Sequence, residues 1–118
     1  MYERNYFING ITELLILSIL SVRDSYAYEI TKTIQNHSDN LLTISQNTIY
    51  GTIYKLQSEG KISEYSMLVG KRRTRIYYHI EDNGSSYLQD LQRNYQQTIT
   101  GVQAVLNSFS NQDYRLSQ

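Results

Sequence analysis

The residues best suited to chemistry in this chain form a short basic run. The run consists of Lys71, Arg72, Arg73 and Arg75. Residues 61–80 hold five basic side chains and one acidic side chain, whereas residues 1–60 and 81–118 each carry a small acidic excess, so the whole chain has a net charge of zero. Ammonium and guanidinium groups bind phosphate oxygens through charge-assisted hydrogen bonds. The charge distribution therefore predicts a local phosphate contact, with a solvated surface loop as the alternative.

A second group of polar side chains precedes the basic run. It consists of Ser45, Gln46, Asn47, Thr48, Tyr50, Tyr54 and Lys55. At helical spacing, several of these residues lie opposite an apolar stripe formed by Ile49, Ile53 and Leu56. Amide, hydroxyl and phenol groups can reach base edges or phosphates without adding net charge. The pattern predicts a helix that contacts double-stranded DNA, with an ordinary exposed helix face as the alternative.

Other kinds of chemistry find little support in the residue types. The chain has no cysteine, which excludes disulfides and thiolate metal sites. His37 and His79 stand far apart without a metal-ligand pattern around them. No Ser/His/Asp spacing, glycine-rich phosphate loop or pair of carboxylates stands out. We therefore expect no catalytic residues, no metal and no cofactor.

Hydrophobic periodicity assigns the two polar groups to elements. It predicts helices over residues 8–22, 26–36 and 46–59, a hairpin of strands 61–69 and 74–80, and a long helix over residues 81–109. We expect Ser25 and Ser45 to cap the second and third helices, and Gly60 to end the third. The basic run then lies at the hairpin tip. These elements predict an α+β, mostly α fold: a winged helix-turn-helix of three helices and a two-stranded wing, followed by a long C-terminal helix.

The last predicted helix carries an apolar seam whose members alternate three and four residues apart. The seam consists of Leu88, Leu91, Tyr95, Thr98, Val102, Val105 and Phe109. Such a seam packs against another helix. We expect the same helix of a second copy, with packing against the chain's own first helix as the alternative. The predicted organisation is a DNA-binding domain over residues 1–80, a dimerisation helix over 81–109 and a flexible tail over 110–118.

Three segments, taken in order, resemble one known family. Residues 26–30 read Tyr-Ala-Tyr-Glu-Ile, residues 44–60 hold the predicted third helix with its flanks, and residues 70–84 hold the hairpin tip and the start of the last helix. Together they are similar to the helix-two, recognition-helix and wing motifs of the PadR-like transcriptional regulators. This resemblance implies a homodimer of the repressor type that binds a pseudo-palindromic operator.

The chain departs from the family pattern at three positions. Asn47 stands where glycine is usual, Gly51 where proline is common, and Tyr95 where the family often has tryptophan. In multidrug-sensing relatives that tryptophan stacks flat ligands across the dimer. By this resemblance, a pocket for a small aromatic ligand would be lined by Phe7, Ile11, Tyr95 and Ile99. The alternative is that the twelve tyrosines serve core and interface packing.

Residues 11–20 form the most apolar stretch, which is shorter than the roughly 20 residues of a membrane span. Residues 1–9 lack the pattern of a secretory signal. We therefore expect a cytoplasmic protein without membrane contact. A ligand-sensing or protein-binding dimeric winged-helix module with weak DNA affinity is the alternative function, which the zero net charge and the altered recognition motif keep open.

Overall fold

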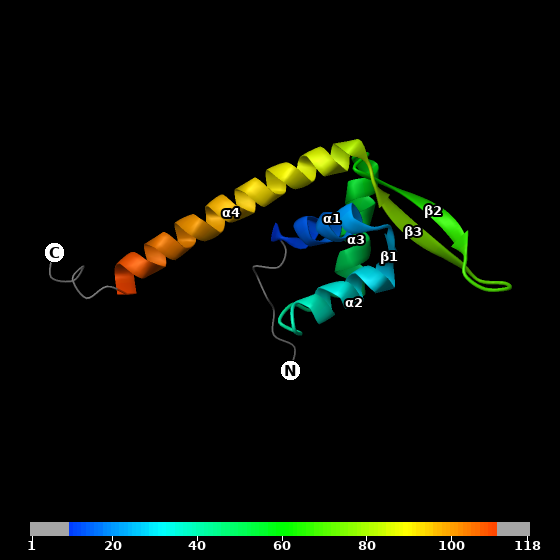
Figure 1. Ribbon diagram of the computed structural model, residues 1–118, viewed down its shortest axis with the longest axis horizontal. Helices are drawn as coiled ribbons and strands as arrows, with labels where there is room; N and C mark the ends of the chain where they lie inside the picture. The colour runs from blue at the N-terminus through cyan, green and yellow to red at the C-terminus, as the bar shows by residue number, and fades with distance from the viewer. Residues whose placement is uncertain (1–9, 111–118) are drawn as a thin grey trace. The chain divides into compact units, whose positions relative to one another are not determined.

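The computed structural model describes residues 10–110 of the 118-residue chain. Its elements are α1 (Thr12–Val22), β1 (Ser25–Tyr26), α2 (Ala27–His37), α3 (Gln46–Ser58), β2 (Ile62–Leu68), β3 (Thr74–Ile80) and α4 (Asp82–Ser110) (Figure 1). The strands form one antiparallel sheet in the order β1-β3-β2. The chain divides into one compact unit over Met1–Leu88 and a second over Gln89–Gln118. The fold predicted from the sequence, a mostly helical winged helix-turn-helix with a long last helix, is confirmed.

The core of the first unit is built from the apolar stripes of three helices and the base of the sheet. Its most buried large side chains are Ile16, Leu17, Ile30, Ile49, Ile53 and Leu56. Ile62 of β2 and Tyr78 of β3 close the core from the sheet side, and both are almost fully buried. Burying these side chains removes apolar surface from water, which is the main force that holds α3 in place. The polar face of α3 is thereby left outward.

The caps of α2 and α3 differ. Ser45 caps α3 as expected, because its hydroxyl accepts a hydrogen bond of 3.2 Å from the backbone N–H of Thr48. The prediction that Ser25 caps α2 is wrong: Ser25 belongs to β1, where it pairs with Tyr78, and the N-cap of α2 is Tyr26 without a side-chain bond. A strand of two residues has no periodicity, so β1 could not be found from the sequence.

The wing, residues 62–80, has two chemically different faces because successive side chains in a strand point to opposite sides. One face contains Glu64 and Tyr78, which pair across β2 and β3. The Gln57 amide of α3 donates to the Glu64 carboxylate at 2.6 Å. We call this the α3-side face. The other, outer face contains the cross-strand pairs Tyr65–Tyr77 and Met67–Arg75.

The first two turns of α4 are fastened to the first unit. The backbone N–H of Glu81 donates to the carbonyl oxygen of Lys61 at 2.9 Å. Gly84 lies so close to Lys61 that a Cβ there would collide with the same carbonyl oxygen. Leu88 is 6 % exposed and belongs to the core of its own chain. In the second unit, residues 92–110 of α4 are exposed. No helix within the described range 10–110 combines the length and hydropathy needed to cross a membrane.

Candidate nucleic-acid interface

The outward face of α3 presents three of the residues predicted to contact DNA. Asn47 is exposed, and Tyr50 and Tyr54 expose 52 % and 74 % of their surface. Within residues 10–110, the side chains of Asn47 and Tyr54 form no hydrogen bond or ion pair. An amide and two phenols are therefore available on one helix face for an external partner.

Three other predicted contacts are engaged in placing α3. Ser45 and Thr48 bond to each other at the helix start, with 3.0 Å between their hydroxyl oxygens. The side-chain amide oxygen of Gln46 accepts a hydrogen bond of 2.5 Å from the hydroxyl of Thr31 in α2. This bond links the two helices of the helix-turn-helix. These three residues thus set where the outward face of α3 points, and their direct contact with DNA remains a prediction.

Lys55, also predicted as a DNA contact, is turned toward α1. Its ammonium group forms an ion pair of 2.8 Å with Glu13, and the Tyr87 hydroxyl of α4 donates to the same carboxylate at 2.5 Å. Partial burial raises the pKa of Glu13, but the bonds from Lys55 and Tyr87 outweigh it and leave the pKa lowered. The Glu13 carboxylate is therefore ionised at neutral pH and joins α1, α3 and α4. We call Glu13, Lys55 and Tyr87 the three-helix junction.

Tyr87 is the most perturbed titratable group of this junction. The hydrogen bond to Glu13, together with partial burial, raises the pKa of Tyr87 to about 12. The ammonium group of Lys61 lies 3.5 Å from the centre of its ring, which is cation–π geometry. Tyr87 thus stays protonated and keeps donating over the physiological pH range. No local pattern in the sequence indicates this junction, because Lys55 and Tyr87 lie 42 and 74 positions from Glu13.

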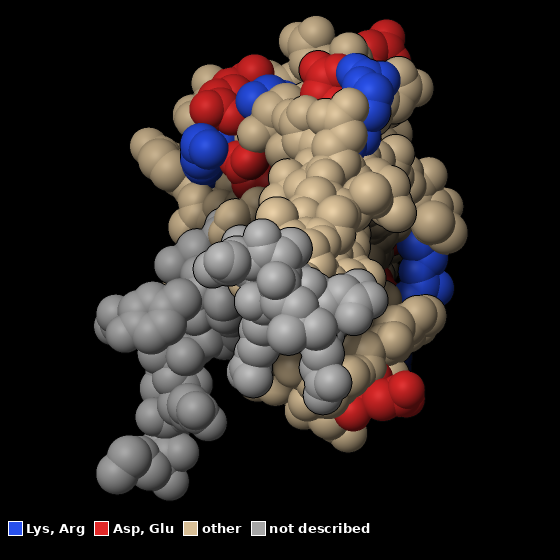
Figure 2. Space-filling view, turned by 90° about the vertical axis from the view of Figure 1, so that its left-hand side faces the viewer, with Lys and Arg blue, Asp and Glu red and all other residues tan. Residues whose placement is uncertain are grey.

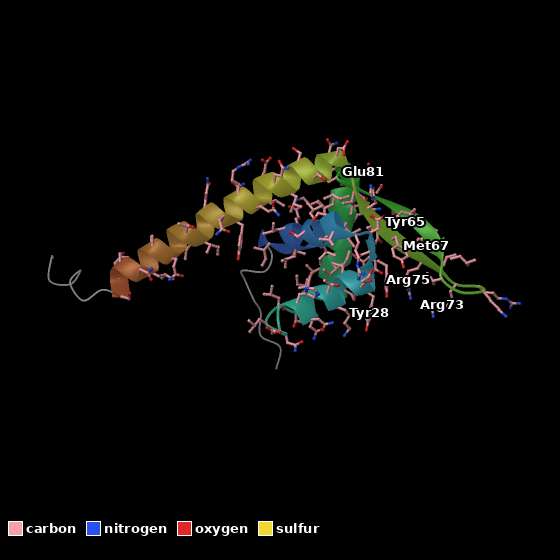
Figure 3. The ribbon with its side chains drawn as sticks, viewed as in Figure 1. Tyr28, Tyr65, Met67, Arg73, Arg75 and Glu81 are labelled. Atoms are coloured by element: carbon pink, nitrogen blue, oxygen red, sulfur yellow. The ribbon has the colours of Figure 1, made fainter. Side chains whose placement is uncertain are left out.

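The wing tip carries cations that have no ion-pair partner among residues 10–110. Lys71, Arg72 and Arg73 are exposed, and none of them forms an ion pair within the described residues. The backbone N–H of Val69 donates to the carbonyl oxygen of Arg73 at 2.9 Å and closes the tip. Figure 3 shows Arg73 close to the end of the wing. The tip therefore holds a compact group of positive charge.

Arg75 differs from the tip cations. It lies on the outer face of the wing, half-buried, with its guanidinium 4.0 Å from the centre of the Tyr26 ring. Tyr77 packs edge-on against Tyr26, with 5.5 Å between the rings, and stacks on Tyr65 at 5.8 Å. Figure 3 shows Arg75, Tyr65 and Met67 along the wing. Arg75 is thus part of an aromatic row that ties the wing to β1.

A polar cluster continues this row toward the base of the wing. The carboxylate of Asp24 accepts from the Tyr65 hydroxyl at 2.7 Å and bonds Nδ1 of His79 at 2.8 Å. The hydrogen bond to Asp24 raises the pKa of His79. Partial desolvation raises the pKa of Asp24, but its two bonds outweigh this and lower it. Asp24 therefore clamps β2 and β3 to the segment between α1 and β1, a role that sequence reasoning missed.

Charge on the face drawn in Figure 2 is mixed. In the view of Figure 2, lysine and arginine side chains lie in small groups among aspartate and glutamate, separated by uncharged surface. This face has no broad field of one sign.

The predicted dimerisation residues divide between core and surface. Leu88 is buried in the first unit and Leu91 is half-buried. The remaining members of the seam, Tyr95, Thr98, Val102, Val105 and Phe109, are exposed on α4. The exposed seam thus begins after Leu91. The role of the seam residues in a dimer remains a prediction.

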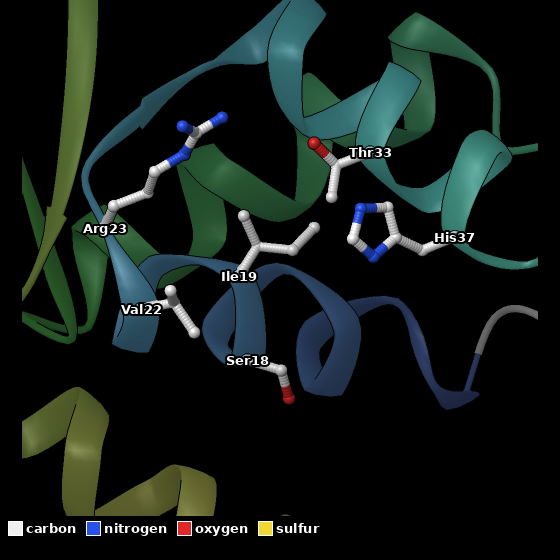
Figure 4. A pocket seen from close by; sticks show the side chains of 6 residues that line it. All are labelled: Ser18, Ile19, Val22, Arg23, Thr33 and His37. Atoms are coloured by element: carbon white, nitrogen blue, oxygen red, sulfur yellow. The ribbon is translucent and has the colours of Figure 1, made fainter.

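The predicted ligand pocket is not tested by the structure. Phe7 lies outside the described residues, Ile11 belongs to the first unit, and Tyr95 and Ile99 belong to the second. A different hollow of about 520 Å³ runs between α1 and α2 (Figure 4). It is lined by Ser18, Ile19, Val22, Arg23, Thr33 and His37. Among the described residues of the predicted pocket, Ile11, Tyr95 and Ile99 do not line this groove.

Comparison with known proteins places the chain among regulators of transcription. The model of the family described as "Transcriptional regulator PadR-like family" matches residues 16–90. The transcriptional regulator YqjI of Escherichia coli is 31 % identical over 88 residues, a match that covers 75 % of this chain and 41 % of YqjI. This chain thus corresponds to less than half of that relative.

Solved structures show the same architecture. A transcriptional regulator from Clostridium thermocellum is 31 % identical and superposes with a TM-score of 0.77, over 93 % of this chain and all of the other. Bacillus subtilis PadR, solved in complex with operator DNA, shares the fold at 24 % identity and a TM-score of 0.62, over 68 % of this chain and 46 % of that protein. With the family match over most of the winged helix, these likenesses show that the chain belongs to the PadR-like family of transcriptional regulators.

Proposed function

We propose that the protein is a sequence-specific DNA-binding regulator that acts as a homodimeric repressor on a pseudo-palindromic operator. The observation that carries this proposal is the outward face of α3, where Asn47, Tyr50 and Tyr54 are exposed on a helix packed firmly through its opposite stripe. In a winged helix-turn-helix, this helix enters the major groove. The operator complex of Bacillus subtilis PadR supports the same use of the fold.

The proposal gives the described residues different tasks. Asn47 can form two hydrogen bonds with a base edge, and the phenols of Tyr50 and Tyr54 can reach bases or phosphates. The exposed cations Lys71, Arg72 and Arg73 neutralise phosphates that flank the major-groove site. Further contacts come from the start of α3, through Ser45, Gln46 and Thr48. Lys55 must break its ion pair with Glu13 before it can bind a phosphate, and Arg75 must leave the ring of Tyr26.

Dimerisation is proposed through the exposed seam of α4. Val102 and Val105 expose 51 % and 55 % of their surface, and Tyr95 exposes 41 %. A helix with such a seam gains stability by burying it against a second copy. Two copies would present two α3 helices to two half-sites, about 34–36 Å apart. We place this regulator in the cytoplasm, together with its DNA.

The test is a salt titration of binding to the protein's own upstream promoter DNA, against a scrambled duplex of equal length. The proposal expects preference for the promoter and an affinity that falls steeply as salt rises. Replacing Arg72 and Arg73 by alanine should weaken binding to both duplexes and flatten the salt dependence. Replacing Asn47 by alanine should instead reduce the preference for the promoter. Equal, weak binding of the unchanged protein to both duplexes would contradict the proposal.

The groove between α1 and α2 favours a second candidate function, a ligand-sensing or protein-binding module with weak DNA affinity. Its volume of about 520 Å³ falls in the range of small-molecule sites, and aliphatic side chains line part of it. A small aromatic ligand bound in the predicted pocket at Tyr95 would change the tyrosine fluorescence of the protein, and one bound in the groove would shift the NMR signals of its lining residue His37. Such a change, together with weak binding to both duplexes, would favour this candidate.

A further inference from the structure

The end of the wing carries exposed aliphatic side chains in addition to its cations. Leu68 of β2 exposes 65 % of its surface and Ile76 of β3 exposes 38 %. In the register of the hairpin, Leu68 pairs with Thr74, and Ser66 pairs with Ile76. Leu68 and Ile76 are therefore diagonal neighbours on one face. We call them the apolar wing patch.

The patch lies on the α3-side face of the wing. Leu68 and Ile76 alternate in phase with Glu64 and Tyr78, which adjoin α3 through the Gln57–Glu64 hydrogen bond of 2.6 Å. The neighbouring residue Met67 lies on the outer face, opposite Arg75. The face of the wing that adjoins α3 thus continues toward the tip with Leu68 and Ile76, beside the small polar residues Ser66 and Thr74.

Charge around the patch indicates what covers it. Lys71, Arg72 and Arg73 follow directly at the tip and have no ion-pair partner within residues 10–110. Two aliphatic side chains bordered by unpaired cations are complementary to a DNA minor groove, whose walls are deoxyribose and whose rims are phosphate. The tip bond between Val69 and Arg73 restrains the hairpin, which lowers the entropy cost of inserting it.

We propose that Leu68 and Ile76 pack against deoxyribose in the minor groove beside the site of α3. This rests on the proposed function and adds a second kind of contact to it. The contact is apolar, so it strengthens binding without releasing counterions. Its fit depends on groove width, which varies with base sequence. The wing thereby reads the shape of the flanking DNA through these two residues.

The experiment compares Leu68→Ala with Met67→Ala on promoter DNA. Both residues are exposed on β2, two-fifths or more, and they differ in the face that they occupy, so Met67→Ala is the matched control. We expect Leu68→Ala to lower affinity about fivefold, the effect of losing part of one buried aliphatic side chain, with an unchanged salt slope. Met67→Ala should leave affinity and slope unchanged. Hydroxyl-radical footprinting, which reports on deoxyribose, should show weaker protection of the flanking sugars with Leu68→Ala alone.

The outcomes separate this inference from the proposed function. If the unchanged protein prefers promoter DNA and Leu68→Ala binds as tightly as Met67→Ala, the patch serves another partner and the inference is wrong. Equal losses of affinity in Leu68→Ala and Met67→Ala would also overturn it, because the effect would then not depend on which face of the wing carries the residue. Absence of promoter preference in the unchanged protein would remove the proposed function and this inference together. Circular dichroism of each variant checks that the exposed truncations leave the fold intact.

Discussion

At the scale of single residues, Asp24 shows how one carboxylate can hold a wing in place. It bonds both Tyr65 and His79, and the bond raises the pKa of His79 while lowering its own. A raised imidazole pKa in the folded state stabilises the fold below the ordinary pKa of about 6.5, and this contribution is lost as the pH rises through the raised value. The Asp24 contribution is lost in the opposite direction, as the pH falls through its lowered pKa.

We predict that Asp24→Asn lowers the pKa of His79 toward its ordinary value. The neutral amide removes the charge that favours the imidazolium form. The measurement is an NMR titration of the His79 ring protons. Asp90→Asn is the control, because Asp90 pairs with Arg93 on the surface of α4. A His79 pKa that does not move in Asp24→Asn would contradict the clamp.

The three-helix junction makes a second prediction about a single hydroxyl group. Tyr87→Phe keeps the ring beneath Lys61 but removes the hydrogen bond to Glu13. We expect a loss of about 1 kcal/mol in the free energy of unfolding, because a hydrogen bond to a charged group disappears at a partly exposed site. Urea unfolding measures this loss. Tyr54→Phe, at a residue 74 % exposed, should change stability little. Equal stabilities for the two variants would show that the hydrogen bond from Tyr87 to Glu13 contributes nothing to stability.

At the scale of elements, two glycines of α4 differ in the space available for a side chain. A Cβ at Gly84 would collide with the backbone carbonyl of Lys61, whereas a Cβ at Gly101 would meet nothing within 4 Å. We predict that Gly84→Ala destabilises the fold by several kcal/mol, since the start of α4 must shift. Gly101→Ala should stabilise it by up to about 1 kcal/mol, because alanine favours a helix interior. Thermal unfolding of both variants tests the pair, and similar melting temperatures would contradict the close approach at Gly84.

The elements themselves were largely predictable because their signals are local. The helical spacing of Ile49, Ile53 and Leu56 predicts the buried side of α3, and the capping residue Ser45 predicts where the helix begins. The short strand β1 was missed, since its two residues depend on pairing with Tyr77 and Tyr78, 51 and 53 positions later in the chain. Ser25 was consequently assigned a capping role that it does not have. Local patterns reveal helices, whereas a strand this short exists only through its partner.

The sequence predicted which residues of the candidate site are exposed better than it predicted which of them form contacts within the chain. The exposure of Asn47 and Tyr54 follows from the helical pattern that predicted it. Lys55 occupies a similar stretch of sequence, yet its charge is paired with Glu13 from another helix. Arg75 belongs to the basic run, but strand alternation turns it away from α3 onto Tyr26. Spacing gives the face of an element, and tertiary contacts decide whether a charge on it is free.

At the scale of the whole molecule, the proposed dimer makes the affinity for operator DNA depend on the seam of α4. Two linked half-site contacts bind much more tightly than one, because the second contact forms at a high effective concentration. Loss of the dimer should therefore appear as a loss of operator affinity. An isolated half-site should be bound as before. This relation allows the seam to be tested without touching any residue of α3 or the wing.

We predict that Val102→Glu converts the protein to a monomer, since two carboxylates would be buried where two copies meet. Sedimentation should show the halved mass, and affinity for a full operator should fall about 100-fold or more, while half-site affinity stays constant. Gln97→Glu adds the same charge on the opposite side of α4 and should preserve the dimer. An unchanged mass for Val102→Glu, or a monomeric unchanged protein, would mean that the seam does not join two copies. Packing of α4 against the chain's own first helix would then be the surviving explanation of its apolar residues.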